Sequence, residues 1–170
     1  GAGKTTLMRI ICGLTQQSQG SYTLLGKTND DSVRKNMGML IEKPGIYEHM
    51  TALENLKYFS LLLNIQHQDH HKILEMVGLQ NAGKKKASQF SLGMKQRLGI
   101  AGAVLEHPQL LLIDEPTNAL DTDGVEMVQE LLLEEKKRGA LIVLACHDFS
   151  ILQSLSDVLY SVKEGRVTPL

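Results

Sequence analysis

The chain has 170 residues, of which 42% are hydrophobic and 22% are charged, and its formal net charge is -1. This balance is typical of one globular domain with a buried core, and it excludes a protein that attracts nucleic acid through an overall positive field. The two cysteines, Cys12 and Cys146, lack CxxC spacing, which favours a reducing compartment over a disulfide framework or a zinc site.

The ends of the chain and its apolar runs bear on size and location. The longest apolar run, residues 140–146, is far shorter than the ~20 residues needed to cross a bilayer, so we expect a partner to make any membrane contact. The first residues stand inside a motif, and no initiator methionine precedes them. We therefore expect a piece of a longer protein, truncated at both ends.

Helix and strand signals alternate along the chain, which predicts an α/β sheet. The predicted helices cover residues 4–14, 51–64, 69–77, a segment from residue 91 to the His107-Pro108 stop, 125–138 and 150–155. The predicted strands cover residues 22–25, 37–41, 110–113, 141–145 and 158–162, the last turning at residues 164–165 into 166–167. Residues 110–113 and 141–145 are continuous apolar runs, typical of strands buried on both faces of a parallel sheet.

The first residues match a phosphate-binding loop. Gly1-Ala2-Gly3-Lys4-Thr5 fill the last five positions of the pattern GxxxxGK(S/T), in which backbone amides and a helix N-terminus surround phosphate oxygens. Lys4 would reach the β and γ phosphates, Thr5 would bind Mg²⁺, and Thr6 would hydrogen-bond the α phosphate. The alternative is a glycine-rich helix cap with a chance lysine.

Two carboxylates follow the apolar run at residues 110–113. Asp114 and Glu115 stand at the carboxyl end of the predicted strand, where ligands bind in open α/β sheets. This is the Walker B pattern, in which Asp114 would hold Mg²⁺ and Glu115 would orient and deprotonate the attacking water. The alternative is a capped strand end before a turn at Pro116. An anion loop and a metal carboxylate need each other chemically, which favours the nucleotide site.

A third motif precedes the acidic strand. Phe90-Ser91-Leu92-Gly93-Met94-Lys95-Gln96-Arg97 resembles the signature of ABC ATP-binding domains, whose usual form is LSGGQ-x-x-R. The matching residues are Ser91, Gly93 and Arg97, and the differing ones are Leu92 and Met94.

Two further segments carry the same resemblance. Residues 114–121 resemble Walker B running into the D-loop, which ends at Asp121, and His147 stands where the family has its switch histidine. The order and spacing of these elements resemble the ATP-binding subunit of ABC transporters over nearly the whole chain.

Residues 37–42 resemble the family's Q-loop segment, with Glu42 where glutamine is usual. In the family this glutamine contacts Mg²⁺ and the attacking water; a carboxylate could still ligate the metal, with added charge. The strings Ile41-Glu42-Lys43-Pro44-Gly45-Ile46-Tyr47 and Thr51-Ala52-Leu53-Glu54-Asn55-Leu56 resemble exporters of the bacitracin and lantibiotic resistance group.

The resemblance implies a fold, an activity and partners. The fold is a P-loop NTPase, three-layer α/β/α with a mostly parallel sheet, forming one partial domain over residues 1–170 with an inserted helical subdomain at about 43–105 that carries the signature. The activity is ATP hydrolysis with Mg²⁺, powering export of a peptide antibiotic or similar amphiphile. The partners are a second ATP-binding subunit, as a homodimer, and a transmembrane permease that holds the protein on the inner face of the membrane from the cytoplasm; no nucleic acid is expected.

The implied site residues fall into three groups. The catalytic residues are Glu115, His147 and Lys4. The nucleotide-binding residues are Gly1, Ala2, Gly3, Lys4, Thr5, Thr6, Ser91, Gly93 and Asp121, of which Ser91 and Gly93 would contact the γ phosphate held by the second subunit. The metal ligands are Thr5, Asp114 and Glu42.

Two other functions remain open. One is an ABC ATPase without a membrane partner, although such proteins usually carry two cassettes or a long insertion, and neither is seen in this chain. The other is a module that binds nucleotide or a partner without turnover. The histidines at 67, 70 and 71 beside Asp69, and the lysines 84–86, are interpreted as solvated surface.

Overall fold

The computed structural model describes residues 2–28 and 31–170. Helices and strands alternate along most of this length, as the hydrophobic periodicity predicts. In chain order they are α1 (Lys4–Ile11), β1 (Thr23–Leu24), β2 (Lys27–Thr28), β3 (Met37–Leu40), α2 (Ala52–Leu62), α3 (His70–Met76), α4 (Leu92–Val104), β4 (Leu110–Asp114), α5 (Thr122–Lys137), β5 (Leu141–Ala145), α6 (Phe149–Leu155), β6 (Tyr160–Lys163) and β7 (Arg166–Pro169). Short 3-10 helices cover Asp31–Asn36, Gln80–Ala82 and Ala87–Gln89.

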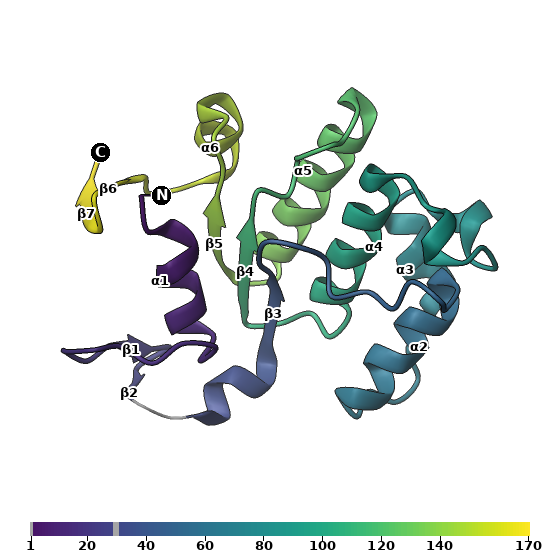
Figure 1. Cartoon of the computed structure of the whole chain (residues 1–170), viewed down its shortest axis with the longest axis horizontal. Coiled ribbons are helices and arrows are strands. Elements are labelled where there is room, and N and C mark those ends of the chain that lie inside the picture. The colour runs from purple at the N-terminus through teal and green to yellow at the C-terminus, as the bar shows by residue number, and fades with distance from the viewer. Residues whose placement is uncertain (1, 29–30) are drawn as a thin grey trace.

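A parallel sheet of order β3-β4-β5 forms the centre of the fold. Figure 1 shows this sheet between α1 on one side and α4 and α5 on the other, which is the predicted three-layer arrangement. Every residue of β4 is buried, because β3 and β5 cover its two edges and helices cover its faces. Two antiparallel hairpins, β1-β2 and β6-β7, lie on the α1 side. The α/β fold class is confirmed.

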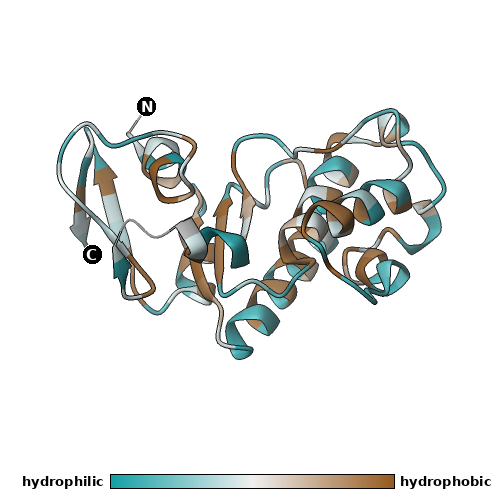
Figure 2. Ribbon diagram, turned by 90° about the horizontal axis from the view of Figure 1, so that it is seen from below, coloured by the Kyte–Doolittle hydropathy of each residue, from teal (hydrophilic) through white to brown (hydrophobic). Residues whose placement is uncertain are grey.

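Helices α2, α3 and α4 pack against one another beside the sheet. Figure 2 shows apolar residues gathered on the strands and on the facing sides of these helices, with polar residues outside. The predicted capping box begins α2: the Thr51 hydroxyl accepts from the Glu54 amide at 3.2 Å, and the Thr51 amide donates to Glu54 Oε2 at 2.7 Å. The predicted subdomain boundaries at about residues 43 and 105 stay a prediction.

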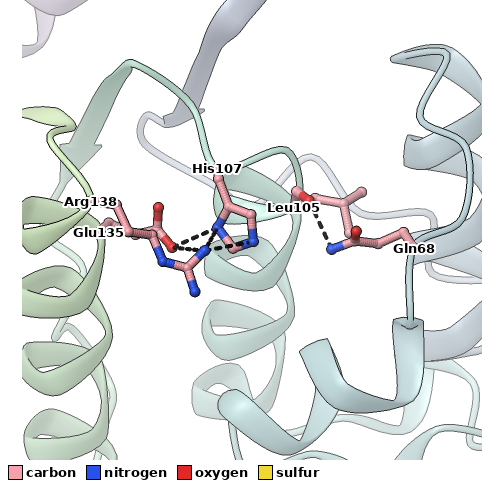
Figure 3. A network of polar contacts seen from close by, with 5 residues as sticks. All are labelled: Gln68, Leu105, His107, Glu135 and Arg138. Atoms are coloured by element: carbon pink, nitrogen blue, oxygen red, sulfur yellow. Dashed lines mark hydrogen bonds and ion pairs between the residues drawn. The ribbon is translucent and has the colours of Figure 1, made fainter.

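A polar network joins the turn after α4 to helix α5 (Figure 3). The carboxylate of Glu135 is 1% exposed, and its Oε1 lies 2.9 Å from Nδ1 of His107. Arg138 reaches the same imidazole, with Nη1 at 2.7 Å from Nε2. His107 has a left-handed backbone (φ 48), which this network holds in place at the start of the segment leading into β4.

Several boundaries and environments differ from the sequence-based expectations. Helix α1 ends at Ile11 rather than at residue 14, because Gly13 turns the chain with φ 79. Residues 22–25 were expected as one strand; instead Leu25 and Gly26 form a turn with positive φ between two-residue strands.

The later elements differ in their starts and burial. Helix α5 begins at Thr122, earlier than residue 125, because the carboxylate of Asp121 accepts the amide hydrogen of Gly124 at 3.0 Å and caps the helix there. Strand β5 was expected to be buried on both faces, yet Leu141 is 53% exposed. It is an edge strand of the described sheet. Over residues 2–28 and 31–170, the chain forms no helix whose length and apolar character would suit a bilayer crossing.

Candidate functional site

The predicted phosphate loop leads directly into helix α1. Gly3 caps the helix in the left-handed conformation (φ 104), which glycine adopts without the steric cost of a side chain, and Lys4 is the first helical residue. Ala2 and Lys4 are partly buried, and Thr6 is exposed. The carbonyl of Ala2 accepts a hydrogen bond from the amide of Gly165, in the turn between β6 and β7, at 3.0 Å. Gly1 lies outside the described residues.

Thr5 and Asp114 meet across the interface between α1 and the sheet. The Thr5 hydroxyl donates to Asp114 Oδ2 at 2.7 Å. Asp114 is the last residue of β4 and is 8% exposed, so its carboxylate is fixed at the carboxyl end of a buried strand. Mg²⁺ prefers oxygen ligands and is commonly bound by one or two protein groups together with substrate phosphates. A hydroxyl and a carboxylate at one point beside the predicted phosphate loop fit that ion.

Glu115 and His147 also lie together. Nε2 of His147 is 3.2 Å from Glu115 Oε1, and the His147 amide donates to Glu115 Oε2 at 3.4 Å. The Glu115 side chain is 18% exposed and that of His147 is 81% exposed, so the imidazole covers the carboxylate from the solvent side. Oε1 accepts no hydrogen bond among the described residues, so its contact with Nε2 of His147 is one of proximity. The predicted catalytic pair is thus adjacent.

Glu42 follows strand β3 with a left-handed backbone (φ 64) and is exposed. Its carboxylate contacts the guanidinium of Arg9, with Nη2 3.3 Å from Oε1. The sequence did not single out Arg9. The sequence around Arg9 does not indicate that its partner is Glu42, because the two residues meet only through the packing of α1 against the sheet.

The signature segment lies against the loop that follows β4. Ser91 caps α4 by accepting the Met94 amide at 3.2 Å. A Cβ at Gly93 would stand 2.6 Å from the carbonyl oxygen of Ala119, so the helix can approach this loop only with glycine at that position. Among the described residues, no hydrogen bond links Ser91 or Asp121 to residues 2–6.

Gln96 is a functional candidate that the motif comparison missed. It is buried, and its Nε2 donates to the carbonyls of Glu115 at 3.1 Å and Pro116 at 3.3 Å. These bonds tie α4 to the backbone that carries the Glu115 carboxylate. The sequence feature that could have identified Gln96 is a polar side chain on the buried face of a helix, because buried polar groups need hydrogen-bond partners.

A cavity of about 490 Å³ lies beside Lys4, between α1, β5 and the β6-β7 hairpin. Its walls are largely apolar, with Leu7, Met8 and Val143 among them. Such a lining offers a triphosphate few hydrogen-bond donors. The amides at the start of α1, rather than this cavity, suit the phosphates.

A model of the family described as ABC transporter matches residues 1–118. The chain is 42% identical over 170 residues to the uncharacterized ABC transporter ATP-binding protein YybJ of Bacillus subtilis (strain 168), which covers 98% of this chain and 78% of YybJ. It is 36% identical over 167 residues to the lantibiotic transport ATP-binding protein SrtF of Streptococcus pyogenes, covering 98% of this chain and 73% of SrtF.

Two further similarities complete the comparison. The bacitracin transport ATP-binding protein BcrA of Bacillus licheniformis is 38% identical over 172 residues, a match that covers 98% of this chain and 56% of BcrA. Among solved structures, an ATP-binding subunit of an ABC transporter superposes with a TM-score of 0.86 at 26% identity, covering 99% of this chain and 75% of that one. The predicted resemblance to the bacitracin and lantibiotic group is confirmed at the level of these relatives.

Proposed function

Because the chain belongs to the ATP-binding, ATP-hydrolysing subunits of ABC transporters, we propose that it holds magnesium ATP where the start of α1 meets the end of β4. The observation that carries this proposal is the 2.7 Å hydrogen bond between Thr5 and Asp114. It brings the phosphate loop and the acidic strand end, far apart in sequence, to one point.

The start of α1 binds the triphosphate. Backbone amides from Ala2 to Thr6 donate to phosphate oxygens, and Lys4 adds a positive charge at the β and γ phosphates. Thr5 and Asp114 hold Mg²⁺, with Glu42 as a further oxygen donor at the end of the neighbouring strand. The metal, when bound, neutralises charge on the phosphates.

Glu115 acts as the general base. Its Oε1 accepts no hydrogen bond from the described residues, which leaves its lone pairs available for a proton from an attacking water. His147, 3.2 Å away, orients this carboxylate and limits the access of bulk solvent. Gln96 positions Glu115 by holding its carbonyl.

A second copy of the chain completes the site. One phosphate loop and one signature are present, and no hydrogen bond among the described residues joins them. Ser91 is exposed at the N-terminus of α4, which suits contact with an anion held by another subunit. We assign Ser91 and Gly93 as contacts of the γ phosphate of the ATP that the other subunit holds. Asp121 is assigned to the segment that passes between the two nucleotide sites. ATP then joins two copies, and hydrolysis releases them.

The transport partner is a membrane permease. A cavity of about 350 Å³ with apolar walls lies between β3, α2 and α4, and Met39, Ile46 and Phe59 are among its lining residues. This cavity and the neighbouring segment of residues 42–58 receive a cytoplasmic helix of the permease, which keeps the subunit on the inner face of the membrane. Residues 43–105 form the helical subdomain that moves with it. The names of SrtF and BcrA support a peptide antibiotic as the exported cargo.

Vanadate-sensitive ATP hydrolysis by the full-length protein tests the proposal. We expect magnesium-dependent turnover that vanadate inhibits, since vanadate takes the place of the transferred phosphate. Nucleotide binding without any turnover, in the presence of the permease, would instead identify a passive binding module.

A further inference from the structure

The carboxylate of Glu42 is paired with a single nitrogen of Arg9. Nη2 of Arg9 lies 3.3 Å from Oε1 and 3.4 Å from Oε2, so one guanidinium nitrogen faces both oxygens. The two side chains are 47% and 50% exposed. The contact is thus a solvent-accessible ion pair, which water, salt or a stronger cation can displace.

Arg9 and Thr5 occupy the same face of α1, one helical turn apart. That face makes two contacts with acidic residues: Thr5 with Asp114, the last residue of β4, and Arg9 with Glu42, which follows β3. The pair therefore belongs to the same interface as the proposed metal ligands.

Glu42 and Glu115 follow the ends of two neighbouring parallel strands, β3 and β4. Leu40 of β3 pairs with Ile113 of β4, and Glu42 and Glu115 stand the same number of residues beyond that pair. Both residues also leave their strands with positive φ, 64 for Glu42 and 51 for Glu115. Such a backbone is uncommon for a residue with a side chain and marks a position that the surrounding structure imposes.

The consequence is electrostatic. Asp114, Glu115 and Glu42 place carboxylates at adjacent strand ends, whereas a glutamine at position 42 would add no charge. Nearby like charges repel, and the guanidinium of Arg9 offsets the additional one. Mg²⁺ carries a larger charge and prefers carboxylate oxygen, so it competes with Arg9 for the same group.

We propose that Arg9 is a positioning residue that holds Glu42 while the site is empty and releases it when magnesium nucleotide binds. The proposal rests on the assignment of Glu42 as a metal ligand in the proposed function. Arg9 thereby sets how strongly nucleotide binding depends on the metal. The exposed geometry fits this role, because the pair is weak enough for a divalent ion to open it.

The test measures binding rather than turnover. The full-length protein and its R9Q, E42Q and R9Q/E42Q variants are titrated with a fluorescent N-methylanthraniloyl ATP, once in EDTA and once in Mg²⁺. The magnesium dependence is the dissociation constant in EDTA divided by the dissociation constant in Mg²⁺, so a larger ratio means that the metal strengthens binding more. Long-range attraction between Arg9 and the phosphates affects both constants and largely cancels from this ratio. We expect R9Q to raise this ratio about two- to fivefold in the Glu42 protein, the strength of an exposed ion pair, and to leave it unchanged in the E42Q protein.

The controls separate the two proposals. R9K keeps the positive charge and is expected to behave like the wild type, and thermal melts of each variant report on folding. Two results would overturn the role of Arg9. In one, R9Q changes the ratio equally in the Glu42 protein and in the E42Q protein. In the other, R9Q changes the ratio in neither protein, although E42Q by itself lowers it. A ratio that E42Q leaves unaltered would instead remove Glu42 from the metal, which is a failure of the proposed function.

Discussion

The hydroxyl of Thr5 donates to Oδ2 of Asp114 at 2.7 Å, although 109 positions separate the two residues. One belongs to the first turn of α1 and the other to the last position of β4. The hydrogen bond holds two oxygen donors at one point. If these two groups are the metal ligands that we propose, they are already oriented, which lowers the entropy lost on binding.

Replacing Glu115 with glutamine is expected to separate chemistry from binding. The amide is close in size to the carboxylate but cannot accept the proton of the attacking water. Turnover should fall on the order of 10²- to 10⁴-fold, as expected for loss of a general base, while the dissociation constant for ATP changes little. Single-turnover hydrolysis and nucleotide titration measure the two effects. Wild-type turnover in E115Q would remove Glu115 from its role.

Replacing Gln96 with alanine is expected to disturb the position of Glu115. The change removes both hydrogen bonds to the carbonyls of Glu115 and Pro116 and leaves those groups short of a buried donor. We expect a stability loss of about 1–3 kcal/mol and a fall in kcat on the order of tenfold, with ATP affinity nearly unchanged. Thermal melts and steady-state kinetics on the same samples check both. A loss of stability with wild-type kcat would show that Gln96 is structural only.

Glu135 is expected to stabilise the junction between the turn after α4 and helix α5. Glu135→Ala removes the buried acceptor for His107 and leaves a cavity beside Arg138 (Figure 3). His107 and Arg138 stay partly exposed, so water can hydrate them after the substitution. We therefore expect a loss of about 1–3 kcal/mol in the free energy of unfolding, less than the cost of leaving a buried charge without a partner.

Chemical denaturation of Glu135→Ala beside Glu134→Ala measures this contribution. Glu134 is the exposed neighbour on the same helix, and its replacement should alter stability by no more than about 0.5 kcal/mol. Equal effects of the two substitutions would contradict a specific role for the network.

The capping box of α2 predicts a pH dependence. The hydrogen bonds from the Thr51 amide and hydroxyl lower the pKa of Glu54 below its usual value. Because the folded pKa is the lower one, the stabilisation is present above the pKa of the unfolded chain, about 4.3, and is lost as pH falls through the folded pKa. Glu54→Gln keeps an acceptor oxygen but cannot titrate.

Thermal melts of wild type and Glu54→Gln between about pH 6 and pH 3.5 measure this difference. The variant should lose less thermal stability than the wild type over the acidic part of the range. Glu75→Gln, an exposed substitution on α3, is the matched control and should follow the wild-type curve. Parallel curves for wild type and Glu54→Gln would contradict the assigned role of the cap.

Local patterns predicted the parts of the site that are encoded in short motifs. Gly3 to Thr5 match the end of a phosphate-loop motif, and Asp114 follows an apolar run in the Walker B pattern. The chemistry of these two motifs together predicted that Thr5 and Asp114 would share one metal site. The contact between Arg9 and Glu42 depends on how α1 packs against the sheet, and neither residue signals the other. The same holds for Gln96, whose partners are backbone carbonyls distant in sequence.

The fold was predictable to a similar extent. The buried strand β4 was evident from its continuous apolar run, because burial on both faces leaves little room for polar residues. Strand β5 has the same composition but lies at an edge of the described sheet, so Leu141 is exposed; composition does not encode position within a sheet. The two-residue strands β1 and β2 are too short to produce a periodic signal.

The central claim is that the phosphate loop and the acidic strand end share one magnesium ion with the nucleotide. The most direct test is the magnesium dependence of nucleotide binding in full-length T5V, D114N and T5V/D114N variants. The measured quantity is the dissociation constant in EDTA divided by that in Mg²⁺. Because two ligands of one ion should act as a unit, each single substitution is expected to lower this ratio at least about tenfold. The double variant is expected to lower it little further than the more severe single substitution. Independent effects that multiply in the double variant, or an unaltered ratio in D114N, would contradict the account.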